Sequence, residues 1–119
     1  YFFLHCDKIV NKGWGYEKWI VNNKMYCGKL LYFVKGKKCS WHFHKIKEET
    51  FYIQSGKILL NVGWDDNIEF SEEIILTAGD SYHIKPGLKH QMTALQITEM
   101  FEFSTEHFDE DSYRIIKGD

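Results

Sequence analysis

The chain has 119 residues, of which 44% are hydrophobic and 17% aromatic, too many large apolar side chains for intrinsic disorder. No apolar run approaches the roughly 20 residues of a membrane helix, and no signal-peptide pattern is visible. The net charge is −2 with both signs interspersed, which argues against a broad nucleic-acid-binding face. We therefore expect one soluble, cytoplasmic domain over residues 1–119. Its cysteines, Cys6, Cys27 and Cys39, form no CxxC pair and are expected to be reduced thiols.

The order of residues predicts strands and turns rather than helices. Only two alanines occur, whereas β-branched and aromatic residues are abundant. Turn residues such as Gly36, Ser55-Gly56 and Pro86-Gly87 separate short apolar or alternating runs. The predicted strands are 19–21, 29–34, 40–44, 50–54, 57–62, 68–70, 73–76, 82–84, 91–94 and 97–103. Strands at such short intervals are typical of an all-β sandwich or barrel.

The alternation in residues 97–103 leaves the inner face of that strand open. Ile97, Glu99, Phe101 and Phe103 share one face of the predicted strand, and Thr98, Met100 and Glu102 share the other. Neither face is purely apolar, so the pattern does not choose between them.

A possible metal site is the strongest chemical signal in the sequence. His42 and His44 are two residues apart, so both imidazoles point to the same side of a strand. Glu49 follows after a short turn, and His90 comes behind the Pro86-Gly87 turn. Three imidazoles and one carboxylate suit one divalent transition metal, such as Zn²⁺, Fe²⁺, Mn²⁺ or Ni²⁺, with positions left open for a substrate. The remaining histidines have no potential metal ligands at a comparable spacing, and we expect His5 and His107 on the surface.

The spacing of these residues resembles the two motifs of the cupin family. Residues 36–56 match the first motif, G(x)5HxH(x)4E(x)6G, and residues 79–90 resemble the second, in which Gly-Asp leads to Pro-x-Gly-x-x-His. Lys85 stands where the second motif usually has proline. The resemblance implies a single-domain antiparallel β-barrel of the jelly-roll type, with a metal bound inside by His42, His44, Glu49 and His90.

A longer resemblance is to the isomerase domain of type II mannose-6-phosphate isomerases. Residues 14–17 are similar to its Trp-Gly opening, and residues 109–119 resemble its closing Glu-Asp-Asp-x-x-Arg-x-x-Asp segment. The chain departs from that family at His42, which replaces glutamine, and at Lys47, which replaces arginine. The resemblance implies a sugar or sugar-phosphate isomerase, in which the metal polarises the substrate and an enediol forms.

Such an isomerase needs a base to move a proton between neighbouring carbons. The candidates are Glu48 beside the metal glutamate, His83, and Glu17 in the Trp-Gly-Tyr-Glu segment, and the sequence does not choose among them. A phosphate could be bound by Arg114, which falls on the arginine of the resembled closing segment and is the chain's one arginine, together with Lys89 beside His90 or with Lys47.

Two other functions stay open. Three histidines and a glutamate also occur in iron-dependent dioxygenase or lyase cupins, and a non-catalytic sugar-binding cupin would keep the same residues. In each case the expected partner is a small molecule, and exposed sheet edges make a homodimer the expected assembly.

Overall fold

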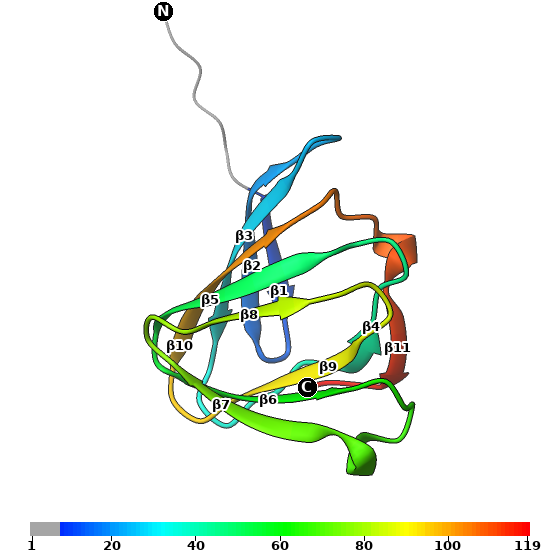
Figure 1. The fold of residues 1–119 in the computed structure, drawn as a ribbon. Helices are drawn as coiled ribbons and strands as arrows, with labels where there is room; N and C mark the ends of the chain where they lie inside the picture. The colour runs from blue at the N-terminus through cyan, green and yellow to red at the C-terminus, as the bar shows by residue number, and fades with distance from the viewer. Residues whose placement is uncertain (1–7) are drawn as a thin grey trace, which may run out of the picture.

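Two antiparallel β-sheets form the computed structural model, which describes residues 8–119 (Figure 1). His5 and Cys6 lie outside the described residues. The strands are β1 Lys8–Lys12, β2 Gly15–Asn22, β3 Cys27–Phe33, β4 Trp41–Phe43, β5 Glu49–Ser55, β6 Lys57–Gly63, β7 Glu72–Thr77, β8 Ser81–Ile84, β9 Lys89–Ala94, β10 Thr98–Ser104 and β11 Tyr113–Ile116. The architecture confirms the expected all-β jelly-roll barrel.

Strands that are distant in the sequence pair within each sheet. The six-stranded sheet has the order β1-β2-β3-β10-β5-β8, and the five-stranded sheet has the order β11-β4-β9-β6-β7. Strand β11, near the C-terminus, therefore lies beside β4, which carries His42 (Figure 1). The edge strands β1 and β11 were not among the predicted strands, because neither shows the buried apolar alternation that marks an inner strand.

The predicted strand at residues 68–70 is wrong. Ile68–Phe70 forms a short 3₁₀ helix, η1, between β6 and β7. The side chain of Asn67 accepts a hydrogen bond from the N–H of Glu69 at 3.0 Å, and the N–H of Ser71 bonds the carbonyl of Ile68. Local hydrogen bonds of this kind compete with the ladder of a sheet. A second 3₁₀ turn, η2, covers Asp109–Asp111.

The inner face of β10 is the one with the glutamate. Thr98, Met100 and Glu102 are buried, whereas Phe103 is 54% exposed on the outer face. Between the sheets the core consists of apolar side chains, with Phe33, Phe51, Ile53, Ile58 and Leu60 almost fully buried. Both described cysteines, Cys27 and Cys39, are free thiols.

Two glycines in tight turns provide a test of this packing. Gly56 and Gly79 both have positive φ, 97° and 91°. A Cβ on Gly56 would lie 2.3 Å from the carbonyl oxygen of Ile97, whereas a Cβ on Gly79 would meet nothing within 4 Å. Gly79→Ala should therefore cost only the conformational term, about 1–2 kcal/mol.

Gly56→Ala should cost about 1–3 kcal/mol more, because the backbone carbonyl and Thr98 must move. Urea denaturation of the two variants gives the free energies of unfolding. Equal losses for both variants would contradict the packing described at the β5–β6 turn.

Candidate metal centre

Three histidines from the five-stranded sheet point into the same space. His42 lies on β4 and pairs across the sheet with His90 on β9, and His44 follows β4 directly. One ring nitrogen from each histidine lies within 4.8 Å of the other two. Because His42 and His90 are direct cross-strand partners and His44 is two residues from His42, strand geometry alone directs the three rings to one side. This group could hold a metal ion.

Each of these histidines is oriented through its Nδ1 atom. The Nδ1 atoms contact backbone carbonyls, which only accept, so each Nδ1 carries the proton and each Nε2 presents a lone pair. The acceptors are Ser40 for His42 at 2.9 Å, Asp111 for His44 at 3.0 Å and Leu88 for His90 at 2.9 Å. Burial lowers the pKa of His44 to about 4 and holds the pKa of His42 well below its usual value. Both rings are thus neutral, as metal ligands must be.

Glu49, the first residue of β5, completes the group. Its Oε2 lies 3.2 Å from Nε2 of His90 and 3.6 Å from Nε2 of His44. Oε2 of Glu49 and Nε2 of His90 are both buried without a hydrogen-bond partner among the described residues. Such orphaned polar atoms are costly, and a cation between them would satisfy both. The four residues that the sequence predicts as ligands therefore lie together and fit a divalent metal.

The turn between His44 and Glu49 is fixed by Asp111 in η2. The carboxylate of Asp111 accepts hydrogen bonds from the N–H groups of Lys45, Ile46 and Lys47, at 2.9, 3.1 and 2.9 Å. Burial raises the pKa of this carboxyl group, but the three N–H donors outweigh that effect and lower it. One buried residue therefore orients His44 through its carbonyl and the loop to Glu49 through its side chain.

Lys47 extends from this turn into the interior and is only 2% exposed. Its Nζ lies 2.8 Å from Oε2 of Glu102, 3.3 Å from Oε1 of Glu49 and 3.1 Å from Nδ1 of His107. Burial lowers the pKa of the ammonium group, but the two carboxylates outweigh this and raise it above its usual value. The same two carboxylates thereby compensate the cost of burying the charge.

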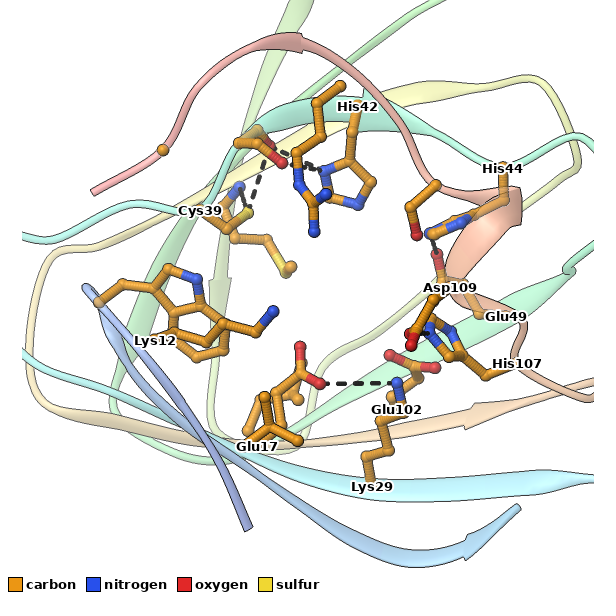
Figure 2. Close-up of a pocket in the computed structure, with 18 of the residues that line it drawn as sticks. Lys12, Glu17, Lys29, Cys39, His42, His44, Glu49, Glu102, His107 and Asp109 are labelled. Atoms are coloured by element: carbon orange, nitrogen blue, oxygen red, sulfur yellow. Dashed lines mark hydrogen bonds and ion pairs between the residues drawn. The ribbon is translucent and has the colours of Figure 1, made fainter. Parts of the chain in front are cut away.

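The metal centre opens into a cavity of about 720 Å³ between β1–β3 and the β4–β11 pair. Figure 2 shows Glu17 and Lys29 on the side of this cavity opposite His42. Oε1 of Glu17 accepts a hydrogen bond from Trp19 Nε1 at 2.9 Å and lies 3.6 Å from Nζ of Lys29. Burial raises the pKa of Glu17, but Lys29 and Trp19 outweigh burial and lower it, so the carboxylate is ionised.

The structure separates the three predicted base candidates. Glu17 lines the cavity, whereas Glu48 and His83 bond each other, each about half exposed, and neither lines it. Successive residues of a strand face opposite sides, so the inward orientation of Glu49 turns Glu48 outward.

Arg114 and Lys89, two of the predicted phosphate ligands, are separated as well. Arg114 lines the cavity and pairs with His42 across β4 and β11. Lys89 points away from it, with Nζ 3.2 Å from the carbonyl of Trp64 and above the ring of Phe43.

Sequence reasoning missed several residues of the site. His107, expected on the surface, lines the cavity and donates from Nε2 to Asp109 at 2.9 Å. Burial together with the charge of Lys47 lowers the pKa of His107. Lys29 and Glu102 face each other across β3 and β10, and both are buried. Alternation within β10 put Glu102 on the same face as Met100, but only the ion pair with Lys47 explains a charge on the inner face.

Comparisons with known proteins agree with this architecture. The family model described as "Cupin domain" matches residues 29–101. No curated protein matches the chain. Among the helices of residues 8–119, none has the length and apolar content to cross a membrane.

Several solved structures share the fold at low sequence identity. KdgF from Halomonas sp. superposes with a TM-score of 0.74 and 14% identity, covering 87% of this chain and 91% of that chain. The capsular polysaccharide assembling protein CapF from Staphylococcus aureus superposes with a TM-score of 0.79 and 17% identity, covering 93% of this chain and 34% of that one. A variant of oxalate decarboxylase from Bacillus subtilis superposes with a TM-score of 0.79 and 15% identity, covering 91% of this chain and 30% of that one. The chain thus spans about a third of the latter two proteins.

At these identities the superpositions establish the fold alone, and the matched family model covers more than half of the chain. Together with the two motifs, the barrel and the three inward histidines, this match shows that the chain belongs to the cupin domain family.

Proposed function

We propose that this cupin is a metal-dependent enzyme that interconverts aldose and ketose forms of a sugar or sugar phosphate. The observation that carries the proposal is the position of Glu17, an ionised carboxylate lining the same cavity as His42, His44 and Glu49. Isomerisation needs a group that polarises a carbonyl and a base that moves a proton between neighbouring carbons.

His42, His44, His90 and Glu49 would hold one divalent ion, which would act as a Lewis acid towards the carbonyl and hydroxyl oxygens of the sugar. Glu17 is suited to accept the proton, since Lys29 keeps its carboxylate ionised. The Trp19 N–H bonds Oε1 and orients the carboxylate, and Oε2 makes no hydrogen bond or ion pair among residues 8–119. Glu48 and His83 lie outside the cavity, so the base role falls to Glu17.

Arg114 supports a phosphorylated or otherwise anionic sugar. It lines the cavity beside His42, and among residues 8–119 its guanidinium makes no hydrogen bond or ion pair. A planar guanidinium can bind a phosphate through two parallel hydrogen bonds. The name of CapF, a capsular polysaccharide assembling protein with the same fold, is compatible with sugar chemistry on this scaffold.

The aromatic residues near the cavity offer little stacking surface for a sugar, and the exposed Trp64 does not line it. Trp14 is buried and stacks on Phe33, and Trp41 is fully buried. Trp19 has the ammonium groups of Lys8 and Lys29 each 4.1 Å from its ring centroid. Recognition therefore depends on charge and on the metal rather than on an aromatic platform.

The expected homodimer and cytoplasmic location stay predictions.

Metal binding is tested by single substitutions of the ligands. His42→Ala and His90→Ala should each lose most of the bound transition metal, because each removes one of four donors. Metal content per chain is measured by elemental analysis of the purified protein. His83→Ala is the matched control and should retain the metal, since this histidine contacts Glu48 outside the cavity. Full occupancy in both ligand variants would reject the assignment.

The base is tested with Glu17→Gln. This variant should keep its metal and lose about 10²–10⁴ in rate, the usual contribution of a general base. The assay is a screen of aldoses, ketoses and their phosphates for interconversion. Glu48→Gln changes a glutamate outside the cavity and should leave the rate unchanged. If no substrate is interconverted but sugars bind, the sugar-binding cupin replaces the isomerase.

The anion-binding role is tested with Arg114→Ala. Sugar-phosphate binding should weaken by about 1.5–3 kcal/mol, the range for a hydrogen bond to a charged group, and Arg114→Lys should recover part of it. Calorimetric titration measures the affinity, with Lys89→Ala as the control. Unchanged affinity with a lowered melting temperature would assign Arg114 to holding β11 in place instead.

A further inference from the structure

We propose that Lys47 is a positioning residue that restricts Glu49 to one metal-binding oxygen and so keeps a coordination position open for substrate. This inference rests on the metal site within the proposed function. It concerns the chain's own residues around the ligand carboxylate and does not depend on which sugar is bound.

The two oxygens of Glu49 lie in different surroundings. Oε2 faces Nε2 of His90 and of His44, and within residues 8–119 it has no hydrogen-bond partner. Oε1 instead lies 3.3 Å from the ammonium nitrogen of Lys47. The side chain of Glu49 is only 1% exposed, so its two oxygens are distinguished by their protein neighbours. The metal side and the lysine side of Glu49 are thus distinct.

Lys47 itself is held in place from three directions. Its ammonium group contacts Oε2 of Glu102 at 2.8 Å and Nδ1 of His107 at 3.1 Å, in addition to Glu49. Nδ1 of His107 is an acceptor, because the lysine only donates and Nε2 of His107 donates to Asp109. The backbone N–H of Lys47 is bound by Asp111 at 2.9 Å. The ammonium group therefore cannot readily leave Oε1.

This arrangement matters because carboxylates bind cations through one or both oxygens. Three imidazoles and one oxygen supply four donors, which leave two positions on an ion that accepts six. A second oxygen from Glu49 would fill one of them. An isomerase that binds neighbouring carbonyl and hydroxyl oxygens needs both positions. Oε2 of Glu102, 2.8 Å from Nζ, already balances the charge of Lys47. The contact of Lys47 with Oε1 of Glu49 is therefore not needed for charge balance alone.

The experiment uses the full chain loaded with Co²⁺, with crystal structures and Co²⁺ titrations of the wild type and of Lys47→Met. In the wild type one oxygen of Glu49 should bind the ion, and in Lys47→Met both should bind. The dissociation constant for Co²⁺ should fall by about tenfold in Lys47→Met, because a positive charge near the ion is removed. Lys47→Arg keeps the charge and should retain the one-oxygen ligand.

Lys45→Met is the matched control on the same turn. Lys45 is exposed, its ammonium group lies over the ring of Tyr113, and this variant should bind Co²⁺ as the wild type does. If Lys47→Met does not fold, Lys47→Gln takes its place with the same expectation. Two Glu49 oxygens on the ion in the wild type, or a single Glu49 oxygen on the ion in Lys47→Met, would overturn the proposal.

The outcomes also separate this inference from the proposed function. A wild-type chain that binds no Co²⁺ overturns both. If Glu49 binds Co²⁺ through one oxygen in the wild type and through two in Lys47→Met, the positioning role of Lys47 is supported even when no aldose is converted. A two-oxygen ligand in an active isomerase overturns the positioning role alone.

Discussion

The candidate metal centre depends above all on the buried carboxylate of Asp111. It accepts three consecutive backbone N–H groups in the turn that joins His44 to Glu49. Without this acceptor the N–H of Lys47, which is a buried residue, would be left unpaired, which costs free energy. The carbonyl of the same residue binds Nδ1 of His44. The C-terminal segment is therefore part of the metal site, although none of the four candidate ligands belongs to it.

The cavity has two chemically different walls. The five-stranded sheet contributes the imidazoles and Arg114, and burial lowers the pKa values of His42 and His44. The six-stranded sheet contributes Glu17, Lys29 and Glu102, and Lys29 pairs with Glu17. Lys47, from the turn before β5, pairs with Glu102. Each buried lysine is compensated by a carboxylate, so the wall stays charged without an isolated ion. A substrate between the walls would meet a Lewis acid on one side and fixed charges on the other.

The cupin fold alone does not specify this chemistry, since proteins as different in name as CapF and an oxalate decarboxylase share it. The proposed chemistry rests on the side chains around the histidines. Glu17 supplies an ionised carboxylate, Arg114 an unpaired guanidinium among residues 8–119, and Lys47 a fixed cation beside a ligand. The proposed isomerase function follows from this set rather than from the barrel.

Much of the molecule could be predicted from the sequence, because strands and metal motifs are local patterns. Period-two alternation and turn residues indicate the all-β fold, and the HxH spacing directs two imidazoles to one face whatever the surroundings. The spacing to Glu49 and His90 then predicts the ligand set. The strand predicted at residues 68–70 is wrong because hydrogen bonds around Asn67 and Ser71 form a 3₁₀ turn there instead.

Only the tertiary structure decided which face of β10 is buried and which candidate residues share the cavity. Alternation leaves two equivalent faces, and Glu102 points inward because Lys47, far away in the sequence, lies opposite it. Glu17 lies across from the histidines because β2 belongs to the other sheet. Asp111 reaches the turn after His44 because β11 pairs with β4. The contact between Lys47 and Glu102 joins residues 55 apart in the sequence, and that between His44 and Asp111 joins residues 67 apart, which no local pattern can specify.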